Sequence, residues 1–299
     1  MKRSIWIALS LCAAGCIDEP EAYDPVVELG FAPAIYSSVR SGGDGAAVPA
    51  EFCVGAWSLP ADVPWSSGSG RAEAFLSGER VTESDGVWRA AEPVNWPESS
   101  LRLTFMGYAP CGESGGCDVH DGVTFHDVDT SVAQVDLLYT DPQTDLSKTD
   151  NGGQVPMPFR HALCELQFRM HRAATDAGEI RLRRVVLEEI FPCGDFASLR
   201  QPQWRTTGSR SAQLFFEGEA VAGKSIRGVG QSRFVIPQHV TCAVTVDFDY
   251  VNEAGNVLSQ HLSTRSLDIV FEPGRRYTCT LTLMPDDVKL LCEIIDFDI

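Results

Sequence analysis

The stretch Cys242-Ala243-Val244-Thr245-Val246-Asp247-Phe248-Asp249-Tyr250 decides the fold class of this chain of 299 residues. One set of alternate positions is apolar and the other is largely polar, a period of two that is typical of a β-strand with one buried face. A helix would repeat its apolar residues every three to four positions instead. The stretch therefore predicts a strand over residues 242–250.

The same alternation recurs along the chain, and no segment has a convincing amphipathic helical pattern longer than three turns. It is found at Leu101–Phe105, Ala162–Met170 and Cys279–Leu283. Turn signals rich in Gly, Pro, Asn and Asp separate such runs, as at Ser41–Gly43, Glu113–Gly116, Asp150–Gly153 and Glu272–Gly274. We therefore expect an all-β protein of two sandwiches in series.

The boundary between these two domains is expected near residue 172. There the segment 172–178, Arg-Ala-Ala-Thr-Asp-Ala-Gly, interrupts the alternation. The first sandwich is predicted over residues 26–172 and the second over 173–299, each long enough for its own core. The polar stretch Thr140–Gly153 is either a linker or a long loop within the first domain.

The N-terminus has the pattern of a secretory signal peptide over residues 1–15. Lys2 and Arg3 precede the apolar run Ile5–Leu11, which is too short to span a membrane. The junction Ala13-Ala14-Gly15-Cys16 resembles a bacterial lipobox, which implies cleavage before Cys16 and lipidation of Cys16 by acyl chains such as palmitate. The alternative is a plain signal peptide with an incidental cysteine.

Residues 16–25 form a predicted acidic tether. Ile17-Asp18-Glu19-Pro20-Glu21 places three acids beside Cys16 and resembles the surface-export tether of lipoproteins in Bacteroides-type bacteria. A solvated, disordered linker would account for the same residues equally well. We expect a lipid-anchored protein at the outer membrane and cell surface.

The net charge excludes several partners. The chain carries 24 basic and 41 acidic residues, for a net charge of −17. Removal of residues 1–15 takes away Lys2 and Arg3 and leaves 22 − 41 = −19. So acidic a protein is not expected to bind nucleic acid or anionic lipid.

Eight cysteines follow Cys16, and in an exported protein an even number permits disulfides. They are Cys53, Cys111, Cys117, Cys164, Cys193, Cys242, Cys279 and Cys292. Eight cysteines allow 105 pairings, and only Cys111 and Cys117 are near enough in sequence to suggest one. Cys164, Cys242 and Cys279 lie on apolar strand faces, where buried free thiols are expected.

Six short motifs occur in order along the chain. The strongest is Pro158-Phe159-Arg160-His161-Ala162-Leu163-Cys164-Glu165-Leu166-Gln167-Phe168. The others are Phe52–Trp57, Trp96–Pro97 with Leu101–Pro110, Asp136–Tyr139, Phe234–Gln238 and Phe271–Thr278. Together they resemble the fimbrillin (FimA/Mfa-like) family, the type V pilin superfamily of Bacteroides-type bacteria. Two departures are Cys164, where Ser is usual, and the absence of the common C-terminal tryptophan.

The resemblance implies two transthyretin-like β-sandwiches and an assembly mechanism. In this family a protease removes the first strand after an Arg or Lys, and a strand from the next subunit fills the groove by β-augmentation. Val26–Phe31 and Ala34–Tyr36 match that first strand, and Arg40 is the candidate cleavage site unless it is only an exposed loop arginine. Cys292–Ile299 is either the donor strand or an ordinary final strand.

The expected function is therefore that of a pilus subunit in adhesion, whose shaft, anchor or tip position the sequence leaves open. The expected partners are other fimbrial subunits, identical or paralogous, the outer membrane through the lipid, and a ligand on a host or bacterial surface. The alternative is a non-polymerising surface lipoprotein that binds a glycan or host ligand.

No motif of a hydrolase, metalloprotease, P-loop protein or dinucleotide-binding enzyme is present, and we expect neither enzymatic activity nor a cofactor. Cys111, Cys117, His120 and His126 do not have the spacing of a zinc site, so no metal is expected. His161 is interpreted as structural. Five tryptophans are expected mainly in the core, namely Trp57, Trp65, Trp88, Trp96 and Trp204.

Overall fold

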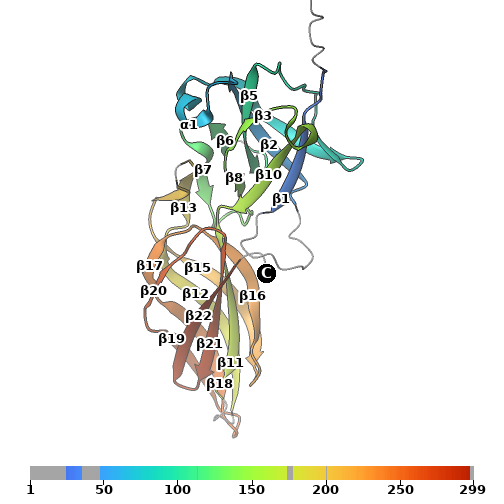
Figure 1. Cartoon of the computed structure of the whole chain (residues 1–299). Coiled ribbons are helices and arrows are strands. Elements are labelled where there is room, and N and C mark those ends of the chain that lie inside the picture. Colours follow the sequence, from blue (N-terminus) through green and yellow to red (C-terminus); the bar gives the residue numbers. More distant parts are fainter. Residues whose placement is uncertain (1–24, 36–47, 113, 174–177, 200, 297–299) are drawn as a thin grey trace, which may run out of the picture.

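The chain folds into two β-rich lobes stacked end to end (Figure 1). The structure is a computed structural model that describes residues 25–35, 48–112, 114–173, 178–199 and 201–296. Within these ranges strands dominate, and the single α-helix is the one-turn α1 (Trp65–Gly68). The prediction of an all-β fold is confirmed. No described helix is long and apolar enough to cross a membrane.

The first lobe is built around a sheet that closes on itself. Its strands pair in the order β2-β3-β4-β1-β10-β8-β5-β9, and β5 pairs again with β2. Their bounds are β1 (Gly30–Ile35), β2 (Glu51–Pro60), β3 (Glu73–Ser84), β4 (Val87–Ala90), β5 (Leu101–Ala109), β8 (Leu138–Thr140), β9 (Gln143–Leu146) and β10 (Gln154–His161). The core inside this ring includes the fully buried Phe52, Phe105 and Phe159.

A second, four-stranded sheet covers the outer face of β2 and β5. Its order is β14-β13-β7-β6, with bounds β6 (Gly115–Asp118), β7 (Gly122–Asp129), β13 (Cys193–Ala197) and β14 (Gln203–Thr207). A core between sheet and ring contains Trp57, Met106, Phe125 and Phe196. Strand β2 is thus buried on both faces, which accounts for the nearly continuous apolar run Phe52–Trp57.

The second lobe is a sandwich of two four-stranded sheets, β16-β11-β21-β22 and β15-β12-β18-β19, with the short pair β17-β20 beside them. Phe168, Phe248 and Leu281 lie in its single core. The bounds are β11 (Cys164–Arg172), β12 (Glu179–Ile190), β15 (Ser211–Ala222), β16 (Arg227–Val235), β17 (His239–Cys242), β18 (Val244–Val251), β19 (Val257–Ser263), β20 (Leu267–Val270), β21 (Arg275–Met284) and β22 (Asp287–Asp296).

The chain passes from the first lobe to the second between β10 and β11. The motif 158–168 therefore contains parts of two strands in different sheets. Strand β11 lies wholly in the second lobe, and the break near residue 172 falls between β11 and β12 of that lobe. Strands β13 and β14 return to the first lobe through β7. The crossover is fixed by Trp204, whose Nε1 donates to the carbonyl of Ala162 at 2.7 Å.

Candidate strand-exchange site

Strand β1 is one strand of the closed ring, and its two edges differ in how many residues pair with a neighbouring strand. On one side it pairs in parallel with β10 over its whole length, from Gly30 opposite Gln154 to Ile35 opposite Phe159. On the other side it pairs with β4 at a single position, Phe31 opposite Trp88. This strand therefore closes the ring, and its hydrogen-bonded contact with β4 is short.

The residues just before β1 extend this contact beside β4. The amide of Leu29 donates to the carbonyl of Val94 at 2.8 Å, and the amide of Trp96 donates to the carbonyl of Val27 at 2.8 Å. The segment 27–35 thus lies in an extended slot between residues 94–96 on one side and β10 on the other.

Alternate side chains of this segment enter the ring core. Leu29 and Phe31 are each 3% exposed, and Val27 and Ile35 pack against the same core. The Phe31 ring meets Phe52 and Phe105 edge-on, with ring centroids 5.9 and 6.2 Å apart. A strand that replaced this segment would therefore need apolar side chains at alternate positions.

The covalent connections of β1 make it removable by one cut. Residues 36–50 connect it to β2, and no other described helix or strand precedes it in the chain. A break within 36–50 would leave β1 attached by non-covalent contacts alone. Arg40 lies in this connection by sequence, but Arg40 and Cys16 both fall outside the described residues, so cleavage and lipidation stay predictions.

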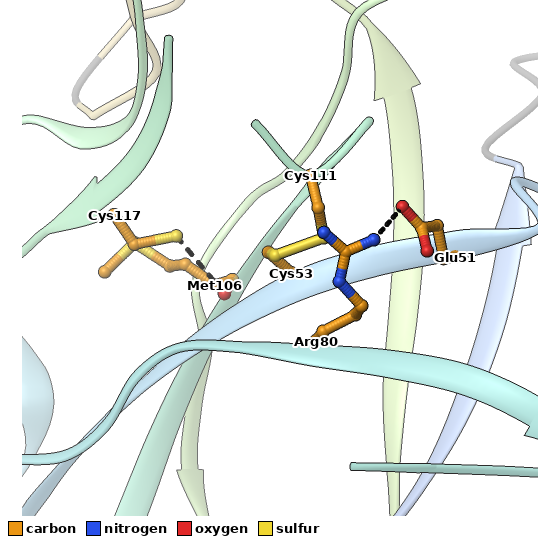
Figure 2. The surroundings of a disulfide bond; sticks show 6 residues. All are labelled: Glu51, Cys53, Arg80, Met106, Cys111 and Cys117. Carbon is orange, nitrogen blue, oxygen red and sulfur yellow. Dashed lines mark hydrogen bonds and ion pairs between the residues drawn. A yellow bond between two sulfur atoms is a disulfide. The ribbon is translucent and has the colours of Figure 1, made fainter. Parts of the chain in front are cut away.

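The predicted Cys111–Cys117 disulfide is wrong. Cys111 pairs with Cys53 instead, with a Cα–Cα distance of 5.3 Å (Figure 2). The reason is register: β5 pairs antiparallel with β2, Cys53 lies opposite Tyr108, and the chain after β5 returns Cys111 to Cys53. Short sequence separation favoured Cys117, but Cys117 lies on β6 in the covering sheet.

Cys117 is a free thiol packed against β2. A Cβ atom on Gly55 would lie 2.9 Å from the Cys117 Cβ, so the missing side chain at Gly55 allows this approach. The Cys117 Sγ points to the carbonyl of Met106 at 3.5 Å. Burial raises the pKa of the Cys117 thiol to about 12, which leaves almost no nucleophilic thiolate at neutral pH.

A second disulfide joins Cys279 of β21 to Cys292 of β22. The two residues are directly opposite in the antiparallel register, with a Cα–Cα distance of 4.0 Å. Cys164 and Cys242 are buried free thiols as expected, whereas that expectation is wrong for Cys279. The candidate donor segment Cys292–Ile299 therefore begins at a covalent attachment. Its residues 297–299 lie outside the described part of the chain.

The remaining candidate residues have structural surroundings. The tryptophans singled out in the sequence pack into or against the two cores of the first lobe. The His161 imidazole contacts the Asp136 carboxylate at 2.9 Å and is 8% exposed. In the described ranges no three His, Cys, Asp or Glu side chains are grouped closely enough to hold a metal ion.

One surface cavity of about 520 Å³ lies in the second lobe between residues 263–267 and the start of β22. Arg265, Lys289 and Asp287 line it together with Ser263, Ser266 and the apolar Leu267, Val288 and Leu290. Its charged side chains have mixed signs, so the cavity has no clear preference for an anion or a cation.

The chain was compared with family sequence profiles and with curated protein sequences. The sequence profile of the fimbrillin-like family matches residues 64–296. No curated protein sequence is significantly similar to the chain.

Solved structures show the same fold. A fimbrial protein from Bacteroides vulgatus superposes with a TM-score of 0.71 at 15% identity, covering 90% of this chain and 99% of its own. Proposed cell adhesion proteins from Bacteroides uniformis and Bacteroides ovatus have TM-scores of 0.56 and 0.54 at 17% and 14% identity. Each covers 92% of this chain, and 100% and 99% of its own length respectively.

Proposed function

The chain belongs to the fimbrillin-like family, and on this premise we propose that it is a cell-surface fimbrial subunit that assembles by β-strand exchange and contributes to adhesion. A lipid on Cys16 tethers the precursor to the outer membrane. Cleavage after Arg40 frees β1, and an extended strand from a neighbouring subunit, identical or paralogous, takes its place.

The single observation that carries this proposal is the position of β1 in the closed ring. It is an N-terminal strand with a full-length hydrogen-bonded neighbour on one side, and its apolar side chains face a preformed core. Its loss would expose the backbone edge of β10 and the aromatic floor formed by Phe52 and Phe105. An incoming strand would restore the hydrogen bonds to β10 and would bury apolar side chains in the ring core. In β-augmentation the backbone hydrogen bonds supply affinity and the alternate side chains fix the register.

The Cys53–Cys111 disulfide supports the proposal because it ties together two strands of the ring that remain. It joins Cys53 of β2 to Cys111, which follows the end of β5. Strand β2 carries Phe52, and β5 carries Phe105. The floor of the emptied slot would therefore stay in place when β1 leaves. A preformed slot lowers the ordering cost of binding a new strand.

The test uses residues 17–299 with a site-specific protease sequence inserted between Ser41 and Gly42. After cutting, mild denaturant should release the fragment that contains β1. A fluorescent peptide of residues 26–37 should then bind the cut protein, as measured by fluorescence anisotropy, and should not bind the uncut protein. The uncut protein is the matched control because it differs only in the continuity of its chain.

Two results would contradict the proposal. One is a cut protein that keeps its folded circular dichroism spectrum after losing the fragment but binds no β1 peptide. The other is a cut protein that unfolds throughout, because no stable acceptor would then exist. Either result would favour a surface lipoprotein that binds a glycan or host ligand without polymerising. The native cleavage site is tested separately by expressing Arg40→Ala in the source cell and measuring the mass of the surface protein.

A further inference from the structure

The cavity of about 520 Å³ in the second lobe is not part of the slot that holds β1. It lies between residues 263–267, which run from the end of β19 to the start of β20, and residues 287–290 at the start of β22. Strands β19, β20 and β22 belong to three different sheets, so the cavity is a gap between the edges of sheets. Its volume is within the range of about 300–1,000 Å³ that is typical of small-molecule sites.

One wall of this cavity is held in place by Thr264, which is 6% exposed. The amide of Thr264 donates to the carbonyl of Val244 at 2.9 Å, and its hydroxyl accepts from the amide of Val244 at 3.1 Å. A second anchor is Leu267, which pairs with Cys242 where β20 meets β17. The backbone of residues 265–266 is therefore fixed at both ends.

The other wall is the start of β22, where Asp287–Leu290 pair with Leu281–Met284 of β21. In the described structure β22 has no second neighbour in its sheet, so the backbone groups on its free side are available for hydrogen bonds. Strand β19 is joined to the turn before β22 by a hydrogen bond from Gln260 Nε2 to the carbonyl of Pro285 at 2.6 Å. A cavity that is already formed lowers the ordering cost of binding a ligand.

The two cations of the lining are unpaired. Within the described residues, the side chains of Arg265 and Lys289 have neither an ion pair nor a hydrogen bond. Arg183 of the same lobe, in contrast, contacts the Asp249 carboxylate at 2.9 Å. The chain has 41 acidic and 24 basic residues, so carboxylate partners are abundant elsewhere. Together with Asp287, the two cations give the lining a net charge of 2 − 1 = +1.

This lining suits a ligand that has several hydroxyl groups and one carboxylate. A hydroxyl group both donates and accepts, so it can donate to the Asp287 carboxylate and accept from the serines of the lining. One carboxylate would balance the net charge, and its two oxygens match the planar N–H groups of the Arg265 guanidinium. The apolar side chains of Leu267 and Leu290 offer contact for the C–H groups of a sugar ring.

We propose that this cavity binds a sugar residue of a glycan that carries a carboxylate group. Arg265 and Lys289 bind the carboxylate, Asp287 accepts hydrogen bonds from the ring hydroxyls, and the apolar side chains contact the ring. The inference goes beyond strand exchange, because the site uses residues of the second lobe alone and needs no cut in the chain. It gives the subunit a direct contact with an acidic glycan.

The test uses the uncut protein of residues 17–299, labelled with isotopes for two-dimensional amide NMR. Methyl glucuronide is the probe, and methyl glucoside is the matched ligand because it has a hydroxymethyl group in place of the carboxylate. Sodium acetate tests whether a carboxylate alone suffices. Arg265→Gln and Lys289→Gln each remove one charge. Arg227→Gln is the matched control, since Arg227 is an exposed arginine of β16 that does not line the cavity.

We expect saturable shifts with the glucuronide at amides of residues 263–267 and 287–290, and binding weaker by about tenfold or more for the glucoside and for acetate. Arg265→Gln and Lys289→Gln should each weaken glucuronide binding by about tenfold, the loss expected when a hydrogen bond to a charged group is removed. Arg227→Gln should leave it unchanged.

Equal binding of the glucoside or of acetate would overturn the inference. So would shifts confined to other residues, or Arg265→Gln and Lys289→Gln proteins that keep a folded spectrum and full affinity. The absence of any saturable shift with the glucuronide would overturn it as well. None of these results bears on strand exchange, which the binding of the 26–37 peptide tests separately.

Discussion

Replacing Phe31 by alanine tests how strongly the ring core holds β1. The Phe31 side chain is 3% exposed and makes edge-on contacts with Phe52 and Phe105. Truncation of a buried Phe to Ala costs about 3–5 kcal/mol, of which each aromatic pair contributes about 0.5–1.5 kcal/mol. At 1.4 kcal/mol per factor of ten, the equilibrium should shift by about 140-fold to about 3,700-fold toward detached β1.

Native-state hydrogen exchange measures this shift strand by strand. If β1 detaches as a unit, amides of β10 that pair with it should lose protection in the Phe31→Ala protein by the amount calculated above. Protection in β12 of the second lobe should not change. The same substitution in the fluorescent 26–37 peptide should weaken its binding to the cut protein by a similar factor.

Ala32→Ser is the matched control on the same strand. Ala32 is exposed, so its replacement should change stability and peptide affinity by less than about 0.5 kcal/mol. Equal effects of the two substitutions would refute the argument that alternate side chains of β1 fill the core. Loss of protection throughout both lobes in Phe31→Ala would refute independent detachment of β1.

Three further predictions concern the cysteines and the partly exposed ion pair of Arg183 with Asp249. Cys53→Ser with Cys111→Ser should lower the urea midpoint of the first lobe more in the cut than in the uncut protein, because β1 no longer bridges the ring. Iodoacetamide at pH 8 should leave Cys117 unmodified in the native protein and modify it after unfolding, as peptide mass mapping would show; rapid native labelling would contradict the raised pKa of its thiol. Hydrogen bonds from Ser259 and Arg183 lower the pKa of Asp249 below 3.8, so its carboxylate stabilises the fold at neutral pH and loses this effect as the pH falls through the lowered value. Asp249→Asn should therefore be less stable than wild type at pH 7 in urea unfolding, with the difference shrinking below pH 3.8.

The strands could be predicted because apolar and polar residues alternate locally along the sequence. The runs Leu101–Phe105 and Cys279–Leu283 fall inside β5 and β21. Partner choice is not local. The stretch 242–250 reads as one strand, but the structure divides it at Ala243 between β17 and β18, which belong to different sheets. Nothing in the period of two distinguishes one sheet from the other.

The features around the candidate site depended on the same non-local information. The family resemblance predicted the first strand at Val26–Phe31 and Ala34–Tyr36, and the structure has β1 at Gly30–Ile35. The Cys53–Cys111 pairing depends on the antiparallel register of β2 and β5, which no short-range signal encodes. The Cys279–Cys292 pairing has a sequence separation of 13. It could have been inferred from two alternating runs joined by the polar turn around Pro285.

The first and the last described strands of the chain, β1 and β22, are held in different ways. Strand β1 pairs in parallel with β10 and would be joined to the fold only by contacts after one cut. Strand β22 has a ten-residue antiparallel ladder and a disulfide whose short loop adds about 3 kcal/mol by the chain-entropy estimate. On the proposed function, a strand from a neighbour would displace only the non-covalent contacts of β1, whereas β22 is bonded covalently to β21. On the proposed function, strand exchange is therefore expected at β1 and not at β22.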